Sequence, residues 1–178
     1  MAAWLEQFWT GIVGNFGDLS DGTAAGVVVG RVLLAAALGG ALGYERERRG
    51  KPDGMRTHAV IALAAALFVL IPHRCGATTA DLTRVVQGLA AGVGFLGAGA
   101  ILKPSSDGAI HGLTSAASVY FTTAIGVGAG LGQGMSATVG TAIVLVILTF
   151  FPRIQRGVEA KLGIPPVTTS HPEPPQKS

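Results

Sequence analysis

The sequence is poor in charged residues. Asp, Glu, Lys and Arg together make up 13% of its 178 residues, about half the share of about 25% that is usual in a soluble domain. Aromatic residues are also few, at 6%. So little charge argues against a soluble enzyme, a nucleic-acid-binding protein and a disordered chain, although the formal net charge is +3. We therefore expect no nucleic-acid partner.

Cysteine and catalytic motifs are also scarce. Cys75 is the only cysteine, which excludes an internal disulfide, a cysteine-rich zinc site and a redox pair. The first basic residue is Arg31, so the positive region of a cleavable signal peptide is missing. Residues 92–97 read Gly-x-Gly-x-x-Gly, but they lie inside an apolar run with no strand before them. We expect a non-enzymatic protein without a cofactor.

Small and apolar residues are abundant. Apolar residues make up 49% of the chain, which holds 27 glycines and as many alanines. Five apolar runs are present, at residues 23–42, 59–71, 85–102, 112–131 and 137–151. A helix that crosses a bilayer needs about 20 residues, so the second and fifth runs must extend into their flanks. The sequence predicts an all-α polytopic membrane helix bundle of about five transmembrane helices.

Proline and glycine positions refine this prediction. Four prolines are expected just outside the runs, because proline disfavours a helix interior: Pro52, Pro72, Pro104 and Pro152. Glycines four residues apart predict close approach between helices, at 26/30, 39/43, 88/92, 126/130 and 128/132. An alternative for residues 94–99 is a broken helix that lines a site.

The distribution of basic residues predicts the orientation. Ten of the 13 Lys and Arg residues fall on one side of the predicted helices, which places the N-terminus outside and the C-terminus in the cytoplasm. We expect a periplasmic interfacial helix within residues 1–22, a transmembrane domain at 23–152 and a largely disordered cytoplasmic tail at 153–178. The alternative for the apolar face at residues 4–16 is a short helix packed on the bundle.

Arg31 is the sharpest single signal for function. It lies inside the first apolar run, where a charge costs about 2.5–3.5 kcal/mol on insertion scales. Residues of this kind mark functional sites. The alternative is a structural pairing with a backbone carbonyl or a carboxylate.

The run at residues 43–58 is the densest in chemistry. Three acids, Glu45, Glu47 and Asp53, offer oxygens that could hold a hard cation, but five basic residues in the same run would repel it. The alternative is a solvated cytoplasmic loop. His58 could sense pH or relay a proton, or simply cap a helix end.

Hydroxyl groups gather in the fourth run. Thr114, Ser115 and Ser118 lie there, and Ser115, Ser118 and Thr122 share one helical face. This face is either functional or bonded to its own helix backbone.

Three blocks resemble the MgtC/SapB family of bacterial inner-membrane proteins: residues 43–47 through 54–58, residues 94–102 and residues 112–118. The resemblance covers roughly residues 27–151. It implies a multi-helix inner-membrane domain, a role in adaptation to low Mg²⁺ and, in some pathogens, survival inside macrophages. It also implies regulation of the rotary ATP synthase, and so of membrane potential. The alternative is a transporter of Mg²⁺ or another cation.

The resemblance also selects residues without assigning their chemical roles. Family motif positions fall on Glu45, Arg46, Glu47, Arg56, Thr57, Gly94, Gly97, Gly99, Gly112, Leu113 and Thr114. Few residues follow the fifth run, so we expect the short, SapB-like form without the ACT-like C-terminal domain. The expected partners are the lipid bilayer, a membrane complex such as the rotary ATP synthase, and further copies in a homo-oligomer.

Overall fold

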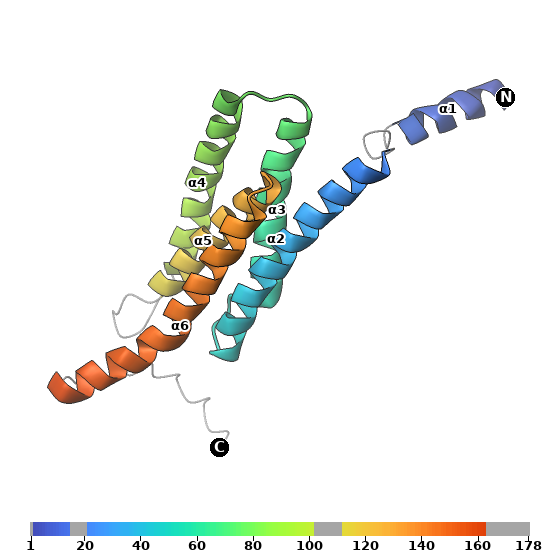
Figure 1. Ribbon diagram of the computed structural model, residues 1–178. Coiled ribbons are helices and arrows are strands. Elements are labelled where there is room, and N and C mark those ends of the chain that lie inside the picture. Colours follow the sequence, from blue (N-terminus) through green and yellow to red (C-terminus); the bar gives the residue numbers. More distant parts are fainter. Residues whose placement is uncertain (1, 15–20, 102–111, 163–178) are drawn as a thin grey trace, which may run out of the picture.

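The computed structural model describes residues 2–14, 21–101 and 112–162, and all the regular structure in these ranges is helical. The described residues form six helices, labelled in Figure 1: α1 (Ala2–Gly14), α2 (Gly22–Arg48), α3 (Met55–Arg74), α4 (Thr79–Ile101), α5 (Leu113–Gly130) and α6 (Gly134–Leu162). The prediction of an all-α polytopic bundle is confirmed.

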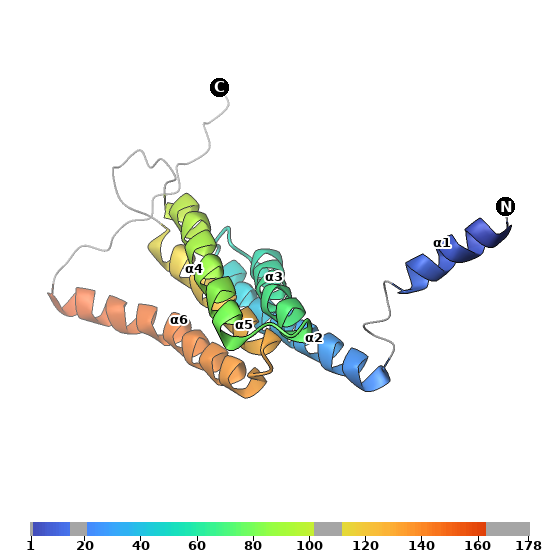
Figure 2. The ribbon, with the colours of Figure 1, turned by 90° about the horizontal axis from the view of Figure 1, so that it is seen from above.

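Four helices of the described part, α2, α3, α4 and α6, are long and apolar enough to cross a membrane. The chain is therefore a multi-pass membrane protein. The fifth expected span, α5, has 18 residues and carries several hydroxyl side chains. It is the central helix, because α2, α3, α4 and α6 all contact it; Figure 2 shows it among them.

The tightest packing joins α3 to α2 and α5. Two of the predicted glycine pairs, 39/43 on α2 and 126/130 on α5, lie directly against α3. A Cβ atom on Gly39 would come within 2.6 Å of the carbonyl oxygen of His58, and one on Gly126 would overlap the carbonyl oxygen of Ala62. The pairs 26/30 and 88/92 instead have open space where a side chain would be.

The core between these helices consists of small side chains. One buried cluster contains only alanines: Ala35, Ala62, Ala66 and Ala129. A second buried cluster contains Leu42, Ile125 and Ala137, with part of α6 packed on it. Small side chains bring the helix backbones close together, which is the usual basis of helix association within a membrane.

The expected helix borders at two prolines are wrong. Pro72 lies inside α3 and Pro152 lies inside α6. Pro72 is in the last turn of its helix, where the missing N–H costs only one helical hydrogen bond. Pro52 lies between α2 and α3, as predicted, and Pro104 lies outside the described residues.

Two arginines bind the backbone in the turn before Pro152. The carbonyl oxygen of Thr149 accepts hydrogen bonds from Arg49 Nη2 at 3.1 Å and Arg153 Nη1 at 2.8 Å. The helical hydrogen bond that Pro152 lacks would go to the carbonyl oxygen of the preceding residue, Leu148. Helix α6 continues to Leu162, past the domain border expected at residue 152. Residues 163–178 of the expected tail lie outside the described residues.

Helix α1 is the predicted N-terminal helix, and it lies apart from the other helices in Figure 1. Leu5 and Trp9 on this helix are exposed. Its place in the membrane interface stays a prediction, as does the orientation of the bundle.

Candidate functional site

Five polar side chains meet at the end of the bundle where α2 passes into α3. They are Arg46 of α2, Asp53 of the connecting loop, His58 of α3, and Ser115 and Ser118 of α5. We call this group the polar cluster. The side chains of Arg46 and His58 are 3% and 0% exposed, so the cluster belongs to the interior of the protein and not to a solvated loop.

The loop that carries Asp53 is held at both ends. Gly50 turns the chain just after α2 with a φ of +68°, a conformation that favours glycine. On the other side, Glu47 Oε2 accepts a hydrogen bond from the backbone N–H of Met55 at 3.1 Å, where α3 begins. The turn at Gly50 and the hydrogen bond from Met55 to Glu47 return the loop over the end of α2, which brings Asp53 back to Arg46.

Arg46, Asp53 and Ser115 form a closed triangle of hydrogen bonds. Arg46 Nε donates to Asp53 Oδ2 at 3.2 Å, and Arg46 Nη2 donates to Ser115 Oγ at 2.9 Å. The Ser115 hydroxyl donates in turn to Asp53 Oδ1 at 3.0 Å. A buried ion pair is tolerated only when further hydrogen bonds satisfy its atoms, and Ser115 supplies them here.

His58 joins the cluster through Ser118. Its Nδ1 lies 3.2 Å from the carbonyl oxygen of Gly54. A carbonyl can only accept, so Nδ1 carries a proton. In the neutral ring Nε2 can accept from the Ser118 hydroxyl, 3.3 Å away. The single proton of this hydroxyl also has an acceptor on its own helix, the carbonyl oxygen of Ser115 at 2.9 Å. When the ring is charged, Nε2 donates to Ser118, whose hydroxyl can then turn to Asp53 Oδ2 at 3.2 Å.

The electrostatics of the cluster favour an ionised Asp53. Burial of this carboxyl raises its pKa, but the charge of Arg46, together with hydrogen bonds from the Asp53 backbone, Ser115 and Arg46, lowers it by more. The pKa of Asp53 therefore lies below its usual value of 3.8. The acid and Arg46 form a neutral pair at neutral pH.

The other two acids of the basic run serve different purposes. Glu45 is buried and pairs with Arg49, the residue that follows the C-terminal end of α2, and Arg49 also binds the Thr149 carbonyl oxygen on α6. Glu47 holds the start of α3. The three carboxylates grouped by the sequence therefore do not converge on one point.

Arg31 lies at the far end of the bundle. Its Nη1 donates to the carbonyl oxygen of Gly130 at 3.1 Å, at the C-terminal end of α5. The unpaired carbonyls of a helix C-terminus carry partial negative charge and favour a cation. Of the alternatives given for Arg31 in the sequence analysis, this contact corresponds to the structural pairing with a backbone carbonyl.

Gly112 is the family-motif glycine that the fold requires. It precedes α5 with a φ of +88°, and a Cβ there would collide with the carbonyl oxygen of Ala100 on α4. Gly97 is buried against α5, but a Cβ on it would meet Ala116 at 3.5 Å, an ordinary contact distance. Five other selected residues are exposed: Arg56, Thr57, Gly94, Gly99 and Thr114.

The structure thus unites residues from two separate parts of the sequence, Arg46 and His58 of the run 43–58 with Ser115 and Ser118 of the fourth apolar run. Their common partner, Asp53, was grouped with two other acids as a cation ligand and was not selected itself. The sequence signal that could have identified Asp53 is its place between Pro52 and Gly54, where the chain is expected to turn back after a basic helix end. Sequence alone could not show that α5 lies across from it.

The cluster is suited to holding helices together and to binding a proton. Asp53, His58 and Ser118 form a short hydrogen-bonded chain along which a proton can be shared. A cation finds one acid there, already paired with Arg46. Within residues 2–14, 21–101 and 112–162, no group of three or more His, Cys, Asp or Glu residues could hold a metal ion.

Comparison with known proteins finds bacterial relatives that share 37–42% of their residues with this chain over the matched regions. SrpB of Synechococcus elongatus is 42% identical over 137 residues, which cover 71% of this chain and 75% of that protein. MgtC of Salmonella typhimurium is 40% identical over 114 residues, 64% of this chain and 48% of MgtC. The "Putative magnesium transporter YhiD" of Escherichia coli is 37% identical over 131 residues, 70% of this chain and 60% of that protein.

The chain therefore spans about half the length of MgtC and three-fifths of YhiD. No solved structure matches it. The model of the MgtC family matches residues 32–157, which include all three sequence blocks and the whole polar cluster. The resemblance read from those blocks is confirmed: this chain belongs to the MgtC family.

Proposed function

We propose that the protein is a non-enzymatic regulator in the bacterial inner membrane, which binds helices of another membrane complex during adaptation to low Mg²⁺ or host stress. The rotary ATP synthase is the first target to test. The observation that carries the proposal is a surface of α4 that consists of small and polar residues and that the other described helices leave uncovered.

This surface contains Gln87, Ala91, Gly94 and Ala98, all exposed. Their spacing of four, three and four residues places them on one face of α4. We call it the outer face of α4. Phe95 borders it and is 81% exposed, the highest exposure among the exposed large apolar residues of the described chain.

The chemistry of the outer face favours a protein helix. A Cβ on Gly94 would meet nothing within 4 Å, so a second helix backbone can come close there, as small residues permit in membranes. Gln87 is exposed within an apolar span, and a carboxamide in that setting is satisfied by a hydrogen bond across a helix interface. Lipid tails offer neither a close backbone nor a hydrogen bond.

Membership of the MgtC family and the magnesium-related name of YhiD support a role in magnesium homeostasis. The outer face of α4 supports regulation by direct binding to the helices of another membrane protein. A further copy of this chain is another occupant to test, and it would give the homo-oligomer that the sequence led us to expect.

The proposal is tested by ATP-driven proton pumping in inside-out bacterial membrane vesicles, with and without the protein. We expect the wild-type protein to lower pumping. Gly94→Leu should abolish the effect, because its side chain blocks the outer face. Gly92→Leu is the matched control: it also adds a side chain to open space on α4, but away from this face, so it should still lower pumping.

Unchanged pumping at high expression of the wild-type protein would reject the ATP synthase as the target. Reduced pumping that survives Gly94→Leu would reject the outer face. Chemical crosslinking of the membranes distinguishes binding to the synthase from self-association, because only the latter joins two copies of this chain.

A cation transporter is the second candidate, supported by the name of the relative "Putative magnesium transporter YhiD". The polar cluster gives it little support, because Asp53 is neutralised by Arg46 and Lys51 lies at the same cavity. Mg²⁺ influx into liposomes that contain the purified protein would establish it. No flux under any gradient would remove it.

A further inference from the structure

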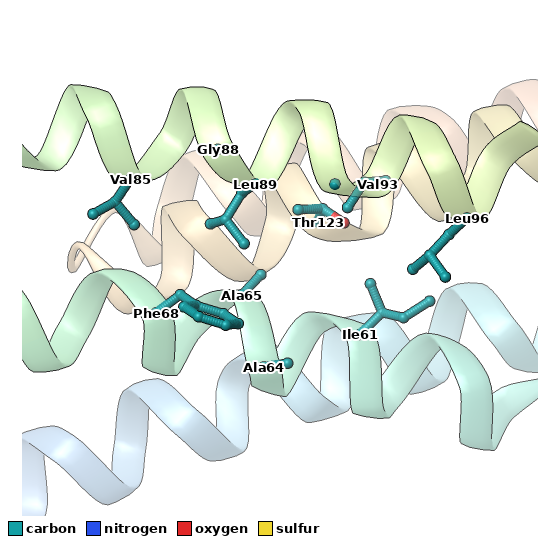
Figure 3. A pocket seen from close by; sticks show the side chains of 11 residues that line it. Ile61, Ala64, Ala65, Phe68, Val85, Gly88, Leu89, Val93, Leu96 and Thr123 are labelled. Carbon is teal, nitrogen blue, oxygen red and sulfur yellow. The ribbon is translucent and has the colours of Figure 1, made fainter.

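Two cavities lie end to end between α3 and α4. One, of about 450 Å³, adjoins the polar cluster and is lined in part by Lys51 and Asp53. The other, of about 520 Å³, is apolar and lies further along the two helices. Ile61 and Leu96 line both cavities, and Figure 3 shows them pointing toward one another from facing helices.

The walls continue through both cavities. Thr57, Ile61, Ala65 and Phe68 of α3 form one wall, and Gly88, Gly92, Leu96 and Ala100 of α4 form the other. Ser115, Val119 and Thr123 of α5 form the floor. Each series recurs every three or four residues and so follows one helix face. The two cavities are therefore one cleft, which we call the α3–α4 cleft.

The shape of the α3–α4 cleft fits an acyl chain. From Gly88 to Ala100 it follows α4 for about 18 Å, slightly more than half of the roughly 30 Å hydrocarbon core of a bilayer. Its deep part is lined almost entirely by apolar side chains. Gly88 and Gly92 have no atoms within 4 Å of a Cβ position, so the α4 wall leaves room for a chain.

The polar end of the cleft carries one net positive charge. Asp53 is paired with Arg46, which leaves the charge of Lys51 uncompensated within the cavity lining. The backbone N–H of Lys51 donates to the carbonyl oxygen of Arg46 at 3.1 Å, which fixes this residue at the cavity. Thr57 adds a hydroxyl there. A phosphate ester complements such a setting.

We propose that the α3–α4 cleft binds an anionic membrane phospholipid, with its phosphate at Lys51 and one acyl chain between α3 and α4. The polar and apolar parts of one continuous cleft match the two parts of one molecule. This proposal does not depend on the function proposed for the outer face of α4.

Native mass spectrometry of the purified, delipidated protein tests this proposal. The probes are phosphatidylglycerol and phosphatidylcholine with identical acyl chains. We expect phosphatidylglycerol to bind more tightly. Lys51→Gln should weaken its binding about fivefold, which corresponds to about 1 kcal/mol per cation. Lys161→Gln, an exposed change on α6, is the matched control and should bind as the wild type does.

A second pair of variants tests the apolar part. Gly92→Leu should weaken phosphatidylglycerol binding by about tenfold or more, because its side chain fills space that the acyl chain needs. Gly94→Leu should leave binding unchanged, since this residue does not line the cleft. Gly92→Leu should therefore weaken lipid binding without changing the effect on proton pumping, and Gly94→Leu should do the reverse. Failure of one proposal is thus distinguishable from failure of the other.

Equal binding of both lipids, unaffected by Lys51→Gln, would overturn the head-group assignment. Equal binding by Gly92→Leu and Gly94→Leu would overturn the cleft. The same spectra report the number of copies of the chain. A wild-type dimer that Gly92→Leu converts to a monomer, without loss of lipid, would assign the cleft to a second copy of the chain instead. Circular dichroism of each variant confirms that the helices are retained.

Discussion

Helices α2 and α5 are joined at both ends by an arginine of α2, but in different ways. Arg46 binds the Ser115 hydroxyl at the beginning of α5, and Arg31 binds the Gly130 carbonyl oxygen at its end. Fifteen positions separate the two contacts on each helix, about 22 Å, so the helices run antiparallel in one register. The first arginine is fully buried and paired with an acid, whereas the second is half-buried and donates to a backbone carbonyl.

The difference shows two ways to place a cation in a membrane bundle. At the α2–α3 end the guanidinium is neutralised by a carboxylate, and each depends on the other because both are shielded from solvent. At the far end a helix C-terminus supplies partial charge without a titratable group. We therefore expect the two ends to respond differently to substitution and to pH.

The largest effect should follow Arg46→Met. It leaves Asp53 shielded without its positive partner, and breaking such a pair costs about 3–5 kcal/mol. The free energy of unfolding of the purified protein in micelles measures this loss. Arg48→Met, an exposed change on the same helix, should stay within about 0.5 kcal/mol.

The double variant Arg46→Met/Asp53→Asn should regain part of the loss, because it removes both charges. If Arg46→Met were no more harmful than Arg48→Met, the buried pair would not be what fixes this end.

A smaller loss is expected from Arg31→Met. It removes a hydrogen bond from a charged donor, worth about 1.5–3 kcal/mol, and leaves behind a helix-terminal carbonyl instead of an unpaired charge. The same unfolding measurement applies. A loss equal to that of Arg46→Met would contradict the distinction between the two ends.

Ser118→Ala should have a weaker effect, about 1 kcal/mol. It removes the hydroxyl between His58 and Asp53 but keeps the ion pair. Thr114→Ala, at an exposed position of the same helix, is the control and should be close to neutral. An equal effect of the two changes would show that the link to His58 is not stabilising.

The smallest effect near neutral pH concerns Asp53. Its pKa is lowered in the folded protein, so the stabilisation by its charged form is complete above the usual pKa of 3.8, which the carboxyl has in the unfolded chain. It is lost as the pH falls through the folded-state pKa. The unfolding free energy should therefore fall only below about pH 4 from this source. In the Asp53→Asn variant, the free energy of unfolding should lack the part of its fall below pH 4 that is due to this carboxyl. In the Arg31→Met variant, that part of the fall should remain.

Much of the architecture could be predicted from the sequence. The apolar runs located all five helices of the bundle, and two of the three family blocks, 43–58 and 112–118, contain the residues of the polar cluster. The helix borders predicted at Pro72 and Pro152 are wrong, because α3 and α6 each continue through the proline with the loss of one backbone hydrogen bond. For Arg31 the alternatives stayed open, since its partner is a carbonyl, which every residue has.

The sequence by itself determined that the chain is helical, lies in a membrane and carries its basic loop between the first two spans, because composition and hydropathy act locally along the chain. Only the tertiary structure decided which residues meet. It placed Asp53 against Arg46 and Ser115, and it turned Gly97 inward and Gly94 outward on one helix. Helical periodicity defines the faces of each helix, but the contact between two faces depends on how the helices pack.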